Sequence, residues 1–326
     1  MTRTVLALWV MSLGSLGAKA DTYVLPSNGD NVVGALGLAS TEHEDTLSDL
    51  ARAYNMGFWE LRLANPVVDA WLPGDGTEVV VPSQYILPKA PQDGIVVNVP
   101  EMRLYYYPRP KAREAQVVIT HPISVGRQDW STPQVRTHVT SKQKDPAWYP
   151  PESIRAEHAA DGDPLPKVVH PGPDNPLGEY ALRLGISGYL IHGTNKPYGI
   201  GMRVTHGCLR LYPRDIASLF AQVKVGTPVR ILNQPYKLGR VNGLVYFEAH
   251  PHLEEDTAKL EQQRAAIDAE FYQLGAYDID WNALQAASQA ANGIPVAVAK
   301  LPAPALGQKT AENGSDTAGS QILLGK

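Results

Sequence analysis

The chain has 326 residues, of which 44% are apolar and 19% charged, so it can bury a sizeable core and is not disordered as a whole. Its formal net charge of -4 provides no global positive field, so we expect neither nucleic acid nor anionic lipid as a partner. The sequence contains a single cysteine, Cys208, which excludes an internal disulfide and any metal site built from several cysteines.

The first 20 residues have the layout of a cleavable secretory signal. Arg3 gives a positive start, residues 5–16 are mostly apolar, and Ala18 and Ala20 place small residues before a cleavage point. An apolar stretch of about 12 residues is too short to span a bilayer, which takes about 20. We therefore expect residues 1–20 to be a signal peptide that is removed after about Ala20, leaving an exported protein without stable membrane insertion.

Residues 36–86 predict a small module with the order strand, helix, helix, strand. Apolar residues at helical spacing begin at Leu47, with Asp45 as the expected N-cap, and the second helix should end at Asn65 before Pro66. The stretches DTLSDLARAYNM, LRLANP and LPGDGTEVVVP resemble a LysM peptidoglycan-binding module. The alternative is a generic helical cap on the following domain.

Residues 94–233 are rich in short alternating strands separated by Pro and Gly, with one clear helix that starts at Pro213. We expect a mainly β, α+β catalytic domain built as a sandwich or barrel. Residues 142–175 show no clear periodic element, and Trp148 within them favours a lid. After residue 233 we expect a helical C-terminal extension over 234–300, with Asp280 capping its second helix, and a disordered tail over 301–326.

The chemistry-bearing residues gather around the lone cysteine. His192 ends an expected strand, and His206 and Gly207 immediately precede Cys208. Pro197 and two glycines exclude a continuous helix between His192 and Cys208, so the chain can turn back and bring them together. A cysteine nucleophile needs a neighbouring base to take its proton, and a backbone carbonyl near Gly193 could orient that base.

Two further features suit acyl transfer. Gly207 permits a close backbone approach, and the N–H groups of Gly207 and Cys208 can face a developing oxyanion. Arg210 lies two residues after Cys208, hence on the same face of an extended strand, where a guanidinium suits a substrate carboxylate. Two other interpretations stay open at this point: an inert buried thiol, and a zinc site made of His192, His206 and Cys208, which lacks the usual ligand spacing.

The stretch IHGTNKPYGIGMRVTHGCLRL strongly resembles the signature of YkuD-type L,D-transpeptidases, and EMRLYYYP, TPQ and NPLGEYALRL are also typical of their catalytic domain. Together with the LysM-like segment, the chain is most similar to the periplasmic subgroup of ErfK/YbiS/YcfS/YnhG type. The resemblance implies that the enzyme acts in the periplasm on tetrapeptide stems of peptidoglycan, cleaving the diaminopimelate–D-Ala bond through a thioester and passing the acyl group to an amine.

Within that resemblance, each candidate residue has an expected role. The roles are nucleophile for Cys208, proton donor and acceptor for His192, support for His206, oxyanion backbone for Gly207, and substrate binding for Arg210, Thr205 and Trp148. No metal or other cofactor is implied. The acceptor stays open between a second diaminopimelate, the C-terminal lysine of a Braun-type lipoprotein, and water. The rival functions are a non-catalytic wall-binding protein and a Cys–His endopeptidase or carboxypeptidase, although such endopeptidases usually place cysteine before histidine.

Overall fold

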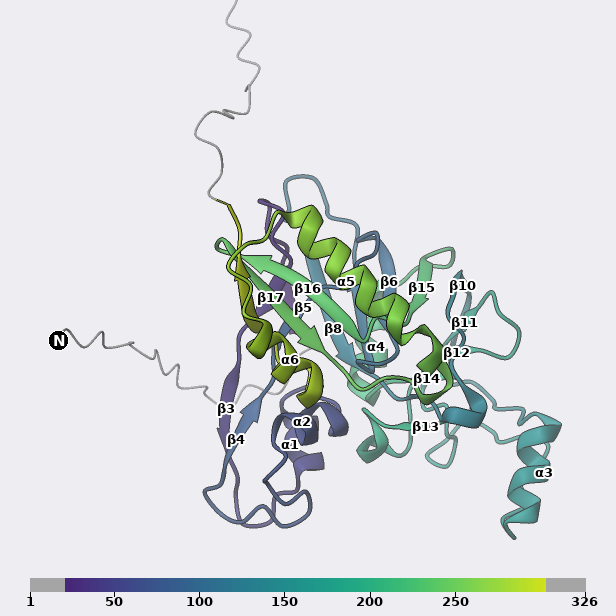
Figure 1. Ribbon diagram of the computed structural model, residues 1–326. Helices are drawn as coiled ribbons and strands as arrows, with labels where there is room; N and C mark the ends of the chain where they lie inside the picture. The colour runs from purple at the N-terminus through teal and green to yellow at the C-terminus, as the bar shows by residue number, and fades with distance from the viewer. Residues whose placement is uncertain (1–20, 303–326) are drawn as a thin grey trace, which may run out of the picture.

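The computed structural model describes residues 21–302, so the predicted signal peptide and the tail from residue 303 lie outside the described range. Its centre is a mixed nine-stranded sheet with the order β1-β8-β7-β6-β15-β10-β11-β12-β14 (Figure 1). Neighbouring strands are antiparallel except at β6–β15 and β12–β14. The strands are β1 (Asp21–Val24), β6 (Gly94–Asn98), β7 (Arg103–Tyr107), β8 (Val117–Pro122), β10 (Val135–Lys144), β11 (Tyr180–Leu184), β12 (Leu190–His192), β14 (Leu209–Arg210) and β15 (Pro228–Leu232). The sheet curls into a half-barrel, which confirms the predicted mainly β, α+β class.

One face of this sheet packs on helix α4 (Pro213–Gln222), which begins with Pro213 at its first position as expected. Ile216 and Leu219 of α4 lie in one core with Leu182 and Ile191 of the sheet. A short parallel pair, β9 (Val125–Gly126) and β13 (Arg203–Thr205), lies beside this core, together with the 3-10 helices η1 (Gln128–Trp130) and η2 (Pro197–Gly199). The core therefore supports the strands that carry the signature residues.

The N-terminal module packs against the opposite face of the sheet. It consists of the strand pairs β2 (Val32–Gly34) with β5 (Gln84–Ile86) and β3 (Gly37–Ser40) with β4 (Glu78–Val81), and the helices α1 (Leu47–Ala53) and α2 (Phe58–Ala64). Strand β6 is buried on both faces, because Ile95 faces the α4 core while Val96 packs against the module. The expected cap was off by one residue: Thr46, not Asp45, caps α1, because its side chain accepts from the Asp49 N–H.

Residues 142–175 contain a helix that the sequence did not predict. Helix α3 (Glu152–Ala160) follows Pro151 and stands away from the sheet at the lower right of Figure 1. Ile154 is its only buried residue. With a single apolar contact and Pro and Gly on both sides, α3 carries almost none of the apolar periodicity from which a helix is recognised.

The C-terminal region is not the purely helical extension that we expected. It forms the antiparallel sheet β16 (Tyr236–Val241), β17 (Leu244–Ala249) and β18 (Val296–Lys300), covered by η3 (Glu254–Lys259), α5 (Leu260–Leu274) and α6 (Trp281–Ala290). Asn242 and Gly243 both have positive φ, at 52° and 77°, and make the tight turn between β16 and β17. Asp280 caps α6 as predicted, accepting from the Ala283 N–H.

A buried lysine joins this C-terminal sheet to the rest of the molecule. The Lys237 ammonium lies 2.9 Å from Glu101 and 2.6 Å from Glu248, and it donates to the Ile86 carbonyl at 2.7 Å. Burial opposes the ionisation of Glu101, but the charge of Lys237 outweighs it and holds the pKa of Glu101 below its ordinary value. Lys237 thus pairs with both carboxylates of this cluster, and Glu248 also lies 2.6 Å from His250. No helix within residues 21–302 is long and apolar enough to cross a membrane.

Candidate active site

The parallel pairing of β12 with β14 brings the two halves of the signature together. His192 is in register with Arg210, and Ile191 with Leu209, which places Cys208, the residue before β14, beside Leu190. Alternate residues of a strand share one face. His192, Cys208 and Arg210 therefore lie on the same face of neighbouring strands, as the sequence spacing predicted for Cys208 and Arg210.

The imidazole of His192 is buried and held by backbone carbonyls. Its Nδ1 atom lies 2.7 Å from the carbonyl oxygen of Gly193, the orienting group that we expected. A carbonyl only accepts, so Nδ1 carries the proton and Nε2 keeps its lone pair. Burial, assisted by the charge of Arg210, lowers the pKa of His192 to about 3. The imidazole is therefore neutral at physiological pH and can accept a proton.

The Cys208 thiol is half-buried and protonated at rest. Its Sγ donates to the Gly188 carbonyl at 3.6 Å. Burial raises the pKa of Cys208, an effect that a backbone bond to Leu190 and the charge of Arg210 oppose only in part. The Cys208 thiol and the His192 imidazole are thus both neutral at rest, and a thiol that acts as a nucleophile must first lose its proton.

The turn before Cys208 requires glycine. Gly207 has φ +95°, and a Cβ at this position would lie 2.8 Å from the Tyr189 ring. The Gly207 carbonyl accepts from Thr132 Oγ1 at 2.9 Å, and the buried Thr205 hydroxyl donates to the Cys208 carbonyl at 2.7 Å. We had expected Thr205 to contact substrate. Thr205 is instead buried with its hydroxyl on the Cys208 backbone, and its contact with substrate stays a prediction.

His206 faces the unexpected helix α3 and not the interior of the sheet. Its Nε2 atom lies 3.1 Å from Glu157, whose carboxylate also pairs with Arg127 at 2.5 Å. The Trp130 ring packs edge-on against His206 with ring centres 5.1 Å apart. Arg127 lowers the pKa of Glu157 through its hydrogen bond, so this carboxylate is ionised. Glu157, Arg127 and Trp130 were missed because no sequence spacing links them to the signature.

The guanidinium of Arg210 has no carboxylate partner within residues 21–302. The Arg210 side chain is half-buried, and its Nε atom has no hydrogen-bond partner within the same range. Burial lowers its pKa, but a guanidinium stays charged in proteins. An unpaired guanidinium next to Cys208 suits a substrate carboxylate.

The Trp148 ring takes part in no hydrogen bond or ring contact with the signature residues within residues 21–302. The backbone of Trp148 forms a bridge with Val169 at the base of the 142–175 segment, through bonds of 2.8 and 2.9 Å. The expected contact of Trp148 with substrate therefore stays a prediction.

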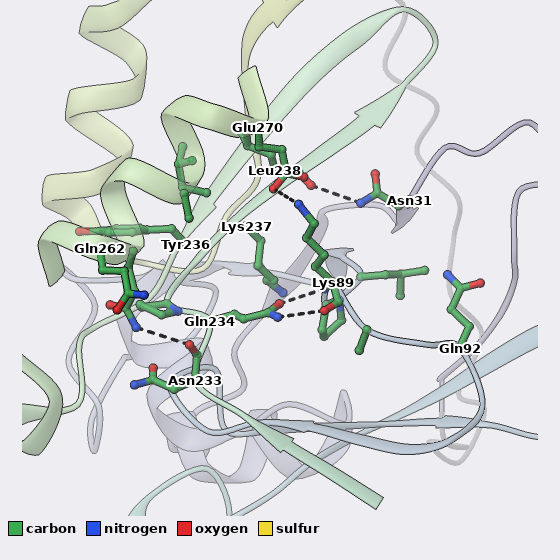
Figure 2. A pocket seen from close by; sticks show the side chains of 17 residues that line it. Asn31, Lys89, Gln92, Asn233, Gln234, Tyr236, Lys237, Leu238, Gln262 and Glu270 are labelled. Atoms are coloured by element: carbon green, nitrogen blue, oxygen red, sulfur yellow. Dashed lines mark hydrogen bonds and ion pairs between the residues drawn. The ribbon is translucent and has the colours of Figure 1, made fainter. Parts of the chain in front are cut away.

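Two cavities within residues 21–302 help to locate the active site. One of about 510 Å³ adjoins the signature at Gly193 and Thr194 and is bounded on its other side by residues 171–179 and the start of α4. The other, of about 480 Å³, lies between the module and α5 (Figure 2). Its polar groups already pair with one another, as Lys89 does with Glu270 at 3.0 Å and Gln234 with the Lys89 backbone. No signature residue lines this second cavity, so it is not the active site.

Comparison with known proteins identifies the family of the chain. The L,D-transpeptidase catalytic domain (YkuD) matches residues 92–231, a range that contains every signature residue. The chain is 44% identical to the probable L,D-transpeptidase YcfS of Escherichia coli over 74% of this chain and 76% of that protein. It is 40% identical to the probable L,D-transpeptidase YbiS of the same organism over 86% of this chain and 92% of YbiS.

The chain belongs to the L,D-transpeptidase family. A third relative, the probable L,D-transpeptidase ErfK/SrfK of E. coli, is 38% identical over 90% of this chain and 96% of that protein. The solved L,D-transpeptidase of Mycobacterium smegmatis is more distant, with 19% identity and a TM-score of 0.34 over 43% of this chain and 58% of that chain. The protein is therefore an L,D-transpeptidase enzyme, and the three relatives from E. coli extend the similarity well beyond the catalytic domain.

Proposed function

We propose that this L,D-transpeptidase acts in the periplasm on the tetrapeptide stems of peptidoglycan, with Cys208 as nucleophile and His192 as its base. The observation that carries the proposal is the common face of Cys208, His192 and Arg210. On that face His192, whose Nδ1 donates to the Gly193 carbonyl, is in register with Arg210, and Cys208 precedes Arg210 by two residues.

The first half-reaction transfers the acyl group to the enzyme. His192 Nε2 takes the thiol proton while Sγ attacks the carbonyl of the diaminopimelate–D-Ala bond. The resulting oxyanion faces the backbone N–H groups of Gly207 and Cys208. When the tetrahedral intermediate collapses, the C–N bond breaks, His192 returns the proton to the leaving amine of D-Ala, and a thioester to Cys208 remains.

The second half-reaction regenerates the thiol. An acceptor amine attacks the thioester, His192 takes a proton from the attacking nitrogen, and that proton returns to the departing sulfur of Cys208. A new amide bond replaces the original one, so no nucleotide is needed. The Arg210 guanidinium binds a carboxylate of the donor stem and fixes the carbonyl over Cys208.

The acceptor is an amine in this proposal: the C-terminal lysine of a Braun-type lipoprotein, or the side chain of a second diaminopimelate. The similarity to the ErfK, YbiS and YcfS group favours the lipoprotein. The N-terminal module, with its LysM-like element order, would hold the enzyme on the glycan and raise the local concentration of stems.

Incubation of the protein with purified tetrapeptide muropeptides, with and without a lipoprotein C-terminal peptide, tests the proposal. We expect release of D-Ala and, by mass, a stem joined to the amine acceptor. A non-catalytic wall-binding protein would release no D-Ala and would form no joined product. An endopeptidase would cut cross-linked muropeptides, and a carboxypeptidase would give tripeptide in place of the joined product.

A further inference from the structure

The loop between the two halves of the active site rests on the N-terminal module. Residues 193–202 leave β12 just after His192 and lead through β13 to the turn that carries Cys208. Two backbone N–H groups at the start of α2 donate into this loop, from Phe58 to the Ile200 carbonyl at 3.0 Å and from Trp59 to the Gly201 carbonyl at 3.3 Å. First-turn N–H groups have no acceptor within their own helix, so the catalytic loop satisfies them.

The two backbones meet without a side chain between them. A Cβ on Gly57 would lie 2.8 Å from Gly201 Cα, and a Cβ on Gly201 would lie 2.3 Å from Gly57 Cα. Gly201 also has φ +81°, a backbone conformation that favours glycine even without the close contact. Gly57, in contrast, has φ -82° and ψ 153°, which any residue adopts, so the close approach alone requires glycine there.

Helix α2 is itself fixed to the central sheet. Glu60 pairs with the fully buried Arg103 of β7 through bonds of 2.6 to 3.1 Å. The Tyr212 hydroxyl, at the start of α4, donates to the Met56 carbonyl at 3.1 Å, and the Asn55 amide donates to the Thr120 carbonyl at 3.3 Å. The module therefore forms a rigid support and is not a tethered domain that swings freely.

The opposite side of the loop is fixed to the strand of the nucleophile. Ser124 Oγ donates to the Gly199 carbonyl at 2.7 Å. The backbone of the same residue exchanges two hydrogen bonds, of 2.8 and 3.0 Å, with Arg210. A shift of the loop at Gly201 is thus transmitted both to Arg210 and, along β13, toward Cys208.

We propose that the start of α2, at Gly57, Phe58 and Trp59, positions the catalytic loop, so that turnover depends on the N-terminal module even when the substrate carries no glycan. This inference deepens the proposed function and rests on it. A module that only bound glycan would be dispensable for a free stem peptide, whereas a module that positions the loop is needed for every substrate.

The test variant is Gly57→Ala in the full chain. Its new methyl group meets the backbone of Gly201, so α2 and the loop must separate by roughly 0.7 Å to restore a carbon–carbon contact of about 3.5 Å. Gly37→Ala is the matched control, because it lies in the same module and its Cβ makes only ordinary contacts, the nearest at 3.5 Å. Both are assayed for D-Ala release from a free tetrapeptide without sugar.

We expect Gly57→Ala to lower kcat by about 10- to 100-fold with little change in KM, since small displacements of catalytic groups have effects of that size. Gly37→Ala should keep wild-type kcat, and both variants should melt cooperatively. Should Gly57→Ala not fold, Tyr212→Phe replaces it, because it removes one hydrogen bond between α4 and the residue before Gly57. We expect Tyr212→Phe to lower kcat several-fold.

Wild-type kcat in a folded Gly57→Ala or Tyr212→Phe variant would overturn this inference while leaving the proposed function intact. If the wild type itself released no D-Ala, the proposed function would fail first. The rate of Cys208 alkylation by iodoacetamide would then decide the inference: equal rates in wild type, Gly57→Ala and Gly37→Ala would overturn it, and a changed rate in Gly57→Ala alone would support it.

Discussion

The unpaired guanidinium of Arg210 gives the most specific prediction about substrate binding. Arg210→Met keeps most of the half-buried stem of the side chain and removes its charge. Because no carboxylate pairs with Arg210 within residues 21–302, the substitution breaks no internal ion pair. The fold should therefore keep its stability, and the loss should fall on catalysis.

The size of that loss follows from the contact that the substrate would make. A hydrogen bond to a charged group contributes about 1.5–3 kcal/mol. Since about 1.4 kcal/mol corresponds to a factor of ten, kcat/KM for D-Ala release should fall by about 10- to 150-fold. The exposed Arg136 of β10 provides the control, because Arg136→Met removes the same charge away from Cys208 and should leave kcat/KM unchanged.

Amidated stems separate substrate binding from an indirect effect of the charge. Tetrapeptides that each carry one carboxylate as an amide are compared between wild type and Arg210→Met. We expect one amide to reduce kcat/KM for the wild type by the same factor as the mutation, and to reduce it little further in Arg210→Met. A loss below about threefold in Arg210→Met, or equal losses for each amide in both enzymes, would refute the assignment.

Two further predictions concern buried groups. Because burial lowers the pKa of His192 to about 3, the imidazole stays neutral down to about that pH. In the pH–rate profile, kcat/KM should therefore stay constant between pH 7 and 5 and fall only as the pH approaches the pKa of His192. An acid limb near pH 6.5 would argue against His192 as the buried base. Lys237→Met leaves Glu101 and Glu248 buried without their cation, so it should lower the free energy of unfolding in urea at pH 7 by about 3–5 kcal/mol. Lys89→Met is the control, because Lys89 is exposed and loss of its ion pair with Glu270 should cost less than about 1 kcal/mol. Similar losses in the two variants would contradict the role of Lys237.

The active-site strands could be predicted from the sequence because their signals are local. Pro213 marks the start of α4, and the two-residue period places Cys208 and Arg210 on one face. The signature itself predicted that His192 would meet Cys208, and the pairing of β12 with β14 brings the two onto one face. The protonation of the pair could not be predicted, because it depends on burial and on the Gly193 carbonyl in three dimensions.

The supporting elements were harder to predict. Helix α3 buries one residue, so its pattern is weak, and the partnership of Glu157 with His206 spans 49 positions. The C-terminal sheet did have a readable signal, the Asn242–Gly243 turn between apolar stretches, which the helical periodicity of α5 obscured. The backbone contact between Gly57 and Gly201 leaves no mark in the sequence beyond two glycines.

Intact-protein mass spectrometry after brief exposure to tetrapeptide stems, without an amine acceptor, tests the central claim most directly. The proposed mechanism predicts a covalent adduct on Cys208 with the mass of the stem less D-Ala, one free D-Ala for each adduct, and loss of the adduct when a lipoprotein C-terminal peptide is added. Cys208→Ala should form no adduct and release no D-Ala. Undiminished D-Ala release by Cys208→Ala would contradict the account.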